Sequence, residues 1–382
     1  MSRFGRGLPM SRWIVGALFA SLVAVSPADA GLHLGMKLAC KRYGDAWSAG
    51  DRAGLEAAVT EEFAAVWQRI PESMFAKLPK SDSTGSAVLS SQKSPTGATV
   101  SVQTQDGVIV FHLQGTGFQW RVADLEVSNL HGEAVSLKQS LEASLTSRDF
   151  LIGLADPAGK SWNGCLSRSM QQAINSLSPD EWRYIQAYLP KLSEPAMAKK
   201  PMVRFFDRLA VLNVTMPGGD SSVQVTLVNE GAWKVDDLEL SGRALRIPSF
   251  RKGMPAMAAV AKLGRFMKDP KSLDPSSFVG DQKLREEFAF LRSGKADAGG
   301  LGSQKMEHLR ITQDVHVYVK YPNRWILVTT TPIGGRAMVS NLQLHDGGAW
   351  RNAADLLALQ RKVKTSPLAD WLSGVSMIDR SR

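Results

Sequence analysis

Two aspartates and one histidine are the residues of this chain whose type and position could support chemistry. Asp124 and Asp237 occupy the same place in two copies of one phrase, Trp-x-Val-x-Asp, which begin at Trp120 and Trp233. His112 lies on an apolar face of a predicted strand. A buried carboxylate has a raised pKa and can act as a general base, and histidine titrates near neutral pH. His112, Asp124 and Asp237 are therefore the predicted ligand-binding residues.

A structural role competes with the chemical one at each of these positions. A third copy of the phrase has Asn341 where the first two have aspartate. Several equivalent active sites in one chain are unusual, whereas a carboxylate that accepts hydrogen bonds from the backbone or a helix end is retained with the fold. A single histidine on an apolar strand face is commonly a core residue. We expect the two aspartates to hold the fold together.

Other constellations that support chemistry are missing from the sequence. The six histidines show no ligand spacing with Asp, Glu or Cys, and no nucleophile elbow or phosphate-binding glycine loop occurs. The sequence therefore predicts no catalytic residue, no metal site and no cofactor. Cys40 and Cys165 are the two cysteines, and they leave a single disulfide open as an alternative to two free thiols.

The phrase itself indicates a repeated architecture. Its copies are Trp120-Arg-Val-Ala-Asp-Leu-Glu-Val127, Trp233-Lys-Val-Asp-Asp-Leu-Glu-Leu240 and the eroded Ala337-Met-Val-Ser-Asn-Leu-Gln-Leu344. Their separation has the size of a small domain, which predicts three units built on one plan.

Each unit begins with helices and ends with strands. Apolar residues recur at three- and four-residue intervals around 36–47, 137–145 and 257–267, and again around 63–70, 162–174 and 278–291. A short second helical segment is expected between the helices of each pair. The period then changes to two, which predicts strands at 98–103, 108–113, 208–214, 223–228, 315–319 and 325–331. Each copy of the phrase is the closing strand of its unit.

These elements predict an α+β fold in which helices cover one face of a curved antiparallel sheet. The three tandem units are placed at 31–134, 135–248 and 249–346, with an insertion near 178–201 in the middle unit. Trp182, Tyr184 and Tyr188 in this insertion are expected to pack against their own unit, the alternative being an exposed contact surface. Apolar residues at 352–372 predict a helical segment within 347–382 that covers the last unit.

Helices followed by a bent antiparallel sheet that ends in Trp-x-Val-x-Asp resemble the nuclear-transport-factor-two-like family. The resemblance covers residues 32–346 and implies domains that fold as α+β cones. The middle phrase, with Ser241, Gly242 and Leu245 behind it, is also similar to the closing strand of periplasmic phospholipid carriers. Isomerases and dehydratases of the family place Asp, His and Tyr in one cone, and no unit here supplies all three in strand positions that face alike.

The first thirty residues are typical of an export signal. Basic residues precede an apolar run at 13–25, and the small residues of Ser26-Pro-Ala-Asp-Ala30 offer a cleavage site. The mature chain is expected to begin near Gly31 in the periplasm or outside the cell.

The charge of the chain favours anionic partners. The formal net charge is +10, and the predicted anionic-surface contacts are Lys199, Lys200, Arg204, Arg251 and Lys252. A solvated face is the alternative interpretation. Expected partners are an envelope protein, an amphipathic small molecule or lipid, and an anionic membrane surface. Nucleic acid is not expected as a partner, because export separates the protein from the nucleic acids of the cell. The sequence also has no basic motif interleaved with aromatic residues.

The sequence as a whole predicts an exported binding or scaffold protein of the bacterial envelope that is not an enzyme. Three related cones multiply surface and cavities, whereas catalysis needs one pre-organised constellation. Two alternatives stay open: a periplasmic lipid carrier, and an isomerase or dehydratase that uses a cone carboxylate. The oligomeric state stays open as well.

Overall fold

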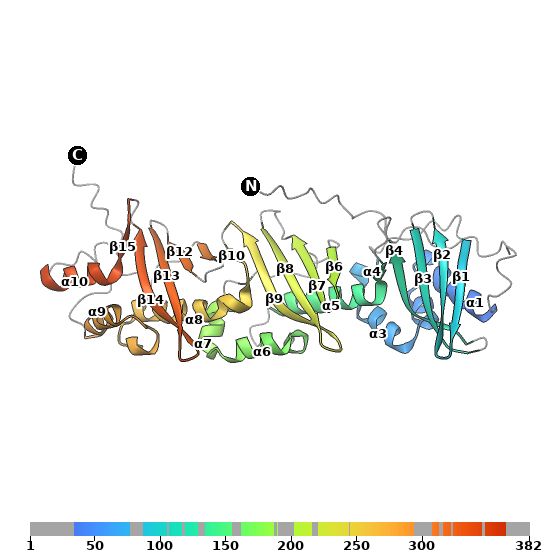
Figure 1. The fold of residues 1–382 in the computed structure, drawn as a ribbon, viewed down its shortest axis with the longest axis horizontal. Helices are drawn as coiled ribbons and strands as arrows, with labels where there is room; N and C mark the ends of the chain where they lie inside the picture. The colour runs from blue at the N-terminus through green and yellow to red at the C-terminus, as the bar shows by residue number, and fades with distance from the viewer. Residues whose placement is uncertain are drawn as a thin grey trace. The chain divides into compact units, whose positions relative to one another are not determined.

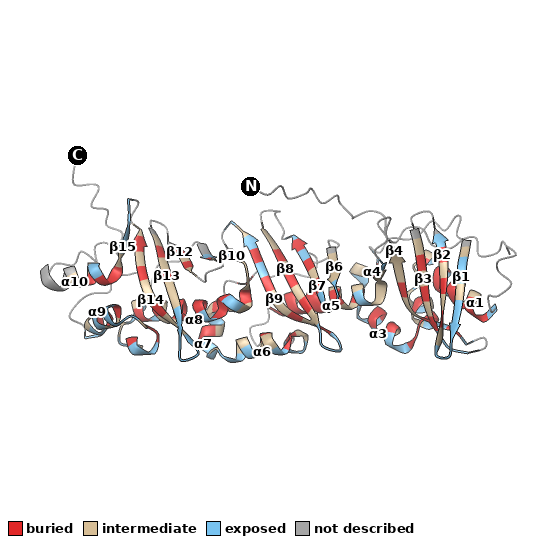
Figure 2. Ribbon diagram, in the orientation of Figure 1, coloured by how far each residue is buried: buried red, intermediate tan, exposed pale blue. Residues whose placement is uncertain are grey.

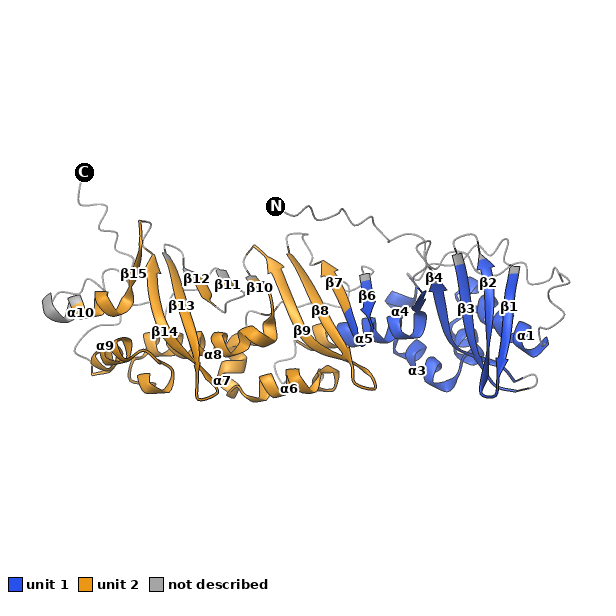
Figure 3. Ribbon diagram, viewed as in Figure 1, with its two compact units in different colours: residues 1–148, 197–210 blue, residues 149–196, 211–382 orange. Residues whose placement is uncertain are grey.

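The structure is a computed structural model in which the chain divides into two compact units (Figure 3). Unit 1 contains residues 1–148 and 197–210, and unit 2 contains residues 149–196 and 211–382. The predicted export signal, Lys199 and Lys200 lie outside the described residues. The structure describes residues 34–76, 87–104, 107–116, 119–128, 134–154, 162–186, 189, 202–215, 221–243, 245–293, 308–312, 316–321, 324–345 and 348–363.

The fold is α+β, with helices against one face of largely antiparallel sheets (Figure 1). The first group of elements consists of α1 (Leu34–Ala49), α2 (Arg52–Ala58), α3 (Glu61–Arg69), α4 (Glu72–Phe75), β1 (Ala87–Ser94), β2 (Gly97–Thr104), β3 (Gly107–Gln114), β4 (Arg121–Ser128) and β5 (Ala134–Ser136). The next group begins with α5 (Leu137–Gly153), η2 (Asn163–Cys165), α6 (Arg168–Asn175) and α7 (Pro179–Gln186). Its strands are β6 (Met202–Phe206), β7 (Leu209–Thr215), β8 (Ser221–Asn229), β9 (Trp233–Gly242) and β10 (Leu245–Ile247).

The remaining elements repeat the order of helices before strands. They are α8 (Phe250–Lys268), η4 (Pro275–Ser277), α9 (Gln282–Arg292), β11 (His308–Ile311), β12 (Val317–Tyr321), β13 (Arg324–Ile333), β14 (Arg336–His345), β15 (Trp350–Asn352) and α10 (Ala353–Val363).

Within the described ranges the strands form two open sheets. The first has the order β1-β2-β3-β4-β5, and the second has the order β15-β14-β13-β12-β11-β10-β9-β8-β7-β6. Among the pairings whose register is described, β10 and β11 pair in parallel and the others are antiparallel. On the helix side, α8 approaches this parallel pair closely at Gly253, where an added Cβ would lie 2.9 Å from Cδ1 of Ile311. The helix therefore packs tightly against the strands at that point.

The closing strands β4, β9 and β14 share one irregularity. The pairing of each with the preceding strand is interrupted by one extra residue in the closing strand. This residue is Ala123 in β4, Asp236 in β9 and Ser340 in β14. Such a bulge bends the strand and redirects a side chain. Just before the bulge, the same strands form isolated parallel bridges, which are Val59 with Val122, Leu166 with Val235, and Val279 with Val339.

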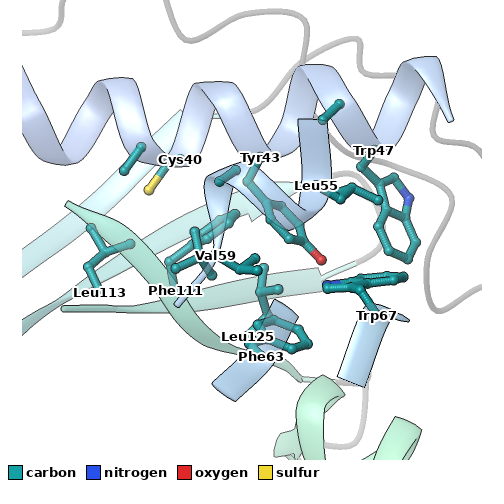
Figure 4. Packing of buried hydrophobic residues seen from close by; sticks show 14 of the residues in the cluster. Cys40, Tyr43, Trp47, Leu55, Val59, Phe63, Trp67, Phe111, Leu113 and Leu125 are labelled. Atoms are coloured by element: carbon teal, nitrogen blue, oxygen red, sulfur yellow. The ribbon is translucent and has the colours of Figure 1, made fainter. Parts of the chain in front are cut away.

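Large aromatic side chains fill the interior of unit 1 (Figure 4). Tyr43 and Phe111 meet edge to face, with ring centroids 6.2 Å apart. Trp47 and Trp67 are also in edge contact, at 5.4 Å between centroids. All four side chains are buried, and Figure 2 shows buried stretches on the strands β2 and β3 of the same unit. Figure 4 shows these rings between α1, α3 and the strands, so side chains of the unit itself occupy this interior.

Unit 2 has its own aromatic packing. Phe266 of α8 stacks on Phe288 of α9, with ring centroids 4.9 Å apart, and both contact Phe278. In the stretch predicted as an insertion, α7 places Trp182 against Trp162 and Phe250, with centroids 5.4 and 6.5 Å away. Trp162 belongs to the predicted middle unit and Phe250 to the predicted third unit, so Trp182 contacts residues of both. Tyr188 lies outside the described residues.

The predicted long helices and inner strands are confirmed, whereas several edge elements were missed. The helical patterns correspond to α1, α3, α5, α6, α8 and α9, and the predicted strands correspond to β2, β3, β7, β8, β12 and β13. The edge strand β1 is largely polar and exposed, so it shows no clear apolar period. The parallel contact of β10 with β11 departs from the predicted antiparallel sheet. The C-terminal helix is described to Val363, and the predicted continuation to 372 lies outside the described residues.

Candidate functional site

Asp124 joins a closing strand to the helix that follows it. Its Oδ2 accepts a hydrogen bond from Ser136 Oγ at 2.5 Å, and its Oδ1 accepts one from the Lys138 backbone N–H at 3.0 Å. Ser136 Oγ in turn accepts from the Gln139 N–H at 3.0 Å. The first N–H groups of a helix have no partner within the helix, and the positive end of its dipole favours a carboxylate. Asp124 therefore caps α5.

Asp237 makes the same contacts in the next copy of the phrase. Its Oδ2 accepts from Ser249 Oγ at 2.5 Å, and its Oδ1 accepts from the Arg251 N–H at 2.9 Å. Ser249 Oγ accepts from the Lys252 N–H at 3.2 Å, so α8 is capped as α5 is. We call the aspartate, the serine and the capped N–H group of each copy the strand-to-helix clamp.

The third copy keeps the clamp in a neutral form. Asn341 Oδ1 accepts a hydrogen bond from Asn352 Nδ2 at 3.0 Å, and Asn352 Oδ1 accepts from the Ala354 N–H at 2.8 Å. The link from closing strand to helix start is thus preserved at the beginning of α10, without a charge. The predicted ligand-binding residues Asp124 and Asp237, and Asn341 at the equivalent position, all make contacts within the fold.

His112 is brought next to Asp124, but the two side chains have different partners. The two residues are direct cross-strand neighbours in β3 and β4. The ring atom Nε2 of His112 lies 3.1 Å from Oε1 of Glu126, while the carboxylate of Asp124 is bonded to Ser136 and Lys138. The structure thus places His112 and Asp124 together without a hydrogen bond between their side chains among those described.

A polar cluster that the sequence did not reveal occurs at the bulge of β9. Asp236 Oδ1 accepts hydrogen bonds from Ser167 Oγ at 2.7 Å, from Ser169 Oγ, and from Arg251 Nη1 at 3.1 Å. Arg251 Nη1 also donates to Ser169 Oγ at 2.6 Å. Asp236 occupies the bulge position that is Ala123 in β4 and Ser340 in β14, which is why the cluster occurs once among the three closing strands.

The hydroxyl of Tyr43 is the most unusual polar group in the interior of unit 1. Its side chain is buried, and within the described residues neither its OH nor Nε1 of Trp67 has a hydrogen-bond partner. Figure 4 shows the hydroxyl directed toward Trp67. Burial raises the pKa of Tyr43 well above its ordinary value of 10.0, and the charge of Asp124 adds to the rise. Tyr43 is therefore protonated at neutral pH and is no base.

The predicted anionic-surface residues have different environments. Arg204 and Lys252 are exposed, whereas Arg251 is half-buried in the Asp236 cluster. Lys199 and Lys200 lie outside the described residues. Arg251 thus has an intramolecular carboxylate partner.

The described ranges contain neither a cluster of metal ligands nor a helix that could span a membrane. Within them, no three His, Cys, Asp or Glu residues gather in a way that could hold a metal ion. No helix in the same ranges has the length and apolar character needed to cross a bilayer. Neither Cys40 nor Cys165 forms a disulfide.

No protein-family model, curated protein or solved structure matches this chain. The resemblance to the nuclear-transport-factor-two-like family therefore stays a prediction that rests on the phrase and on the order of helices and strands.

Proposed function

We propose that this protein is a non-catalytic binding or scaffold protein of the bacterial envelope, exported and built from three tandem cone-like units. The observation that carries the proposal is the strand-to-helix clamp. The carboxylates most suited to acid–base chemistry, Asp124 and Asp237, each accept hydrogen bonds from a serine and from a helix N-terminus. A general base needs a lone pair directed at a substrate. The lone pairs of these two carboxylates are directed at serine hydroxyls and backbone N–H groups of the protein itself.

Three further features support three units on one plan. Each closing strand has a bulge, a parallel bridge to the segment before a helix, and a link to the helix that follows. The bridges are accompanied by equivalent hydrogen bonds: the N–H groups of Thr60, Ser167 and Gly280 donate to the carbonyls of Val122, Val235 and Val339, at 2.8–2.9 Å. Nearest-neighbour contacts that recur in this way are typical of tandem repeats.

The packing of the interior favours a role for the outer surface. In unit 1, Tyr43, Phe63, Trp67 and Phe111 are all buried against one another and against the strands. A carrier of an acyl chain needs room for its cargo, and a drug-sized pocket has a volume of several hundred Å³. Side chains that fill the interior support a protein that binds through its surface over one that carries lipid inside.

Native mass spectrometry of protein purified from a bacterial envelope tests the proposal. We expect the mass of the mature chain alone, no stoichiometric lipid in a solvent extract, and no uptake of a fluorescent phospholipid. Stoichiometric lipid in the purified protein would replace the proposal with the lipid carrier.

The enzyme alternative needs a separate test. Asp124→Asn and Asp237→Asn are expected to lower the melting temperature, because each weakens a helix cap. If either variant kept the parent melting temperature and yet abolished a cellular phenotype, the carboxylate would have a chemical role and the proposal would fail.

A further inference from the structure

Two arginines lie side by side where β10 and β11 pair in parallel. Arg246 and Arg310 are direct cross-strand partners, and both side chains are exposed. Partners in register project from the same face of a sheet. The neighbouring residues Ile247 and Ile311 are buried toward Gly253 of α8, so the two arginines project from the face opposite that helix.

This arrangement of like charges costs stability unless an anion is bound. Like charges directly opposite each other on neighbouring strands are destabilising. Among the described residues, no carboxylate lies within ion-pair distance of either guanidinium. Arg310 is held in place by Trp325, with its guanidinium carbon 5.8 Å from the ring centroid. A fixed guanidinium beside a second one offers donors in the geometry that binds a phosphate or carboxylate group.

The arginine pair borders a set of strands without acidic residues, whereas β9 on its other side carries the exposed Glu239. Strands β10 to β15 contain no aspartate and no glutamate. Across β9 and β12, the direct neighbours of the pair are Ser241 and Tyr318, which add hydroxyl groups to the same row. Arg336 of β14 is a further exposed cationic residue of these strands.

Aromatic residues on this face contact one another. Trp350 is 40% exposed, and its ring lies 6.1 Å from Tyr318 and 5.0 Å from His345 between centroids. The ring of Trp325 faces the guanidinium of Arg310. Trp325 thus supports Arg310, and Tyr318 and His345 support Trp350. Rings that already contact side chains of the protein have less free surface on which successive bases could stack.

We propose that this face of β10 to β15 docks on an anionic membrane surface, with Arg246 and Arg310 binding the phosphate of a lipid headgroup. The proposal rests on the proposed function, for which it names the anionic partner. Basic residues near an anionic bilayer each contribute about 1 kcal/mol of binding free energy. Trp350 has the amphipathic ring that suits the interface between headgroups and acyl chains.

Co-sedimentation with vesicles tests the proposal on the full mature chain. We expect binding to vesicles of phosphatidylglycerol and phosphatidylcholine, and little binding to phosphatidylcholine alone. The double variant Arg246→Gln/Arg310→Gln should weaken binding about 30-fold, because two contributions of about 1 kcal/mol are lost. The matched control Arg42→Gln/Arg121→Gln removes the same charge from exposed positions of unit 1 and should bind as the parent does.

Four results would overturn the proposal. Equal losses in the two double variants would indicate general charge attraction without a specific face. Equal binding to neutral vesicles would remove the role of the phosphate charge. Release from vesicles by millimolar inorganic phosphate would assign the pair to a soluble oxyanion. Tighter binding to a single-stranded oligonucleotide than to anionic vesicles would assign the face to a polyanion.

Two further measurements distinguish a loss of membrane docking from unfolding of the variants and from failure of the proposed function. Circular dichroism should show both double variants folded, since all four arginines are exposed. Native mass spectrometry without vesicles tests whether lipid is carried inside the protein. A protein that is empty by mass but does not bind anionic vesicles would refute membrane docking and leave the scaffold proposal intact.

Discussion

The carboxylate of Asp237 accepts a hydrogen bond from the backbone N–H of Arg251, fourteen positions later, at 2.9 Å. Asp124 has the same relationship to Lys138 at the same separation, with a distance of 3.0 Å. In each case a serine twelve positions after the aspartate completes the contact. A motif that looks like a repeated active-site carboxylate is thus a repeated helix cap.

Replacing a clamp aspartate should reduce stability. Asp124→Ala or Asp237→Ala leaves a serine hydroxyl and a helix N–H without the carboxylate, and we expect a loss of about 1–2 kcal/mol in the free energy of unfolding. Urea denaturation followed by circular dichroism measures the loss. The control is Asn341→Ala, whose neutral link should cost less. Variants that unfold at the parent urea concentration would contradict the capping role.

The contact between α7 and α8 should depend on pH through Glu181. Burial tends to raise the pKa of this carboxyl, but Lys262 and Ser178 outweigh it and hold the pKa below its ordinary value of 4.5. Oε1 of Glu181 lies 2.8 Å from Lys262 Nζ, and Oε2 accepts from the Ser178 N–H at 2.6 Å. A lowered folded-state pKa adds stability above the unfolded-state value, and this stability is lost as the pH falls through the folded-state value.

Glu181→Gln should therefore be less stable than the parent at neutral pH, by about 2 kcal/mol. The difference should close as the pH falls below 4.5. Thermal melts across this range provide the measurement. Asp180→Asn is the control, because the ion pairs of Asp180 with Arg183 and Arg265 are exposed and contribute little. A Glu181 effect that persists undiminished in acid would show that shape, and not charge, holds α7 in place.

Cys40 should resist alkylation in the folded protein. Its side chain is fully buried, and burial raises the pKa of its thiol to about 12. The thiolate is the reactive form, so reaction with iodoacetamide at neutral pH should be slow until the chain unfolds. Mass spectrometry of labelled peptides should find Cys165 modified first, since it is less buried. Rapid labelling of Cys40 in native protein would show that the interior of unit 1 opens readily.

Tyr43→Phe should keep or increase the stability of unit 1. The hydroxyl is buried without a partner among the described residues, and a buried hydroxyl without a hydrogen bond costs about 1–3 kcal/mol. Its removal keeps the ring contacts with Trp47 and Phe111. Differential scanning calorimetry measures the change. A variant that melts clearly below the parent would indicate that the hydroxyl is hydrogen-bonded in solution, for example to an internal water.

Deletion of everything after His345 should cause aggregation. Ala353, Ala354 and Leu357 of α10 are buried, and the loss of one buried leucine side chain alone removes about 2 kcal/mol of burial energy. The truncation also removes Asn352, the partner of Asn341. Size-exclusion chromatography and thermal melting follow the outcome. A soluble truncation with a cooperative melt would mean that α10 is dispensable.

Local patterns in the sequence predicted the helices and the inner strands, because their apolar periods are long and regular. They also indicated the structural role of Asp124 and Asp237, since the aspartate recurred with the phrase. The serine of the clamp left a signal as well: Ser136 and Ser249 stand at equal distances from their aspartates. That shared spacing was readable without a structure.

Other features depend on which strands meet, and no local pattern encodes that. The pairing of Arg246 with Arg310 joins segments more than sixty positions apart through short strands. The role of Asp236 follows from a bulge, and the phrase alone gives no indication of where the pairing shifts. The edge strand β1 is too polar to show an apolar face.

The clamp also determines where the chain can be cut. The unit boundaries suggested by the phrase, 134/135 and 248/249, fall between each aspartate and the N–H group that it caps. A recombinant fragment that stops at either boundary would end in a closing strand whose carboxylate has lost its partners. A fragment that includes the first turns of the following helix keeps them, so fragments that end near 143 or 256 should express better than fragments that end at the repeat boundaries.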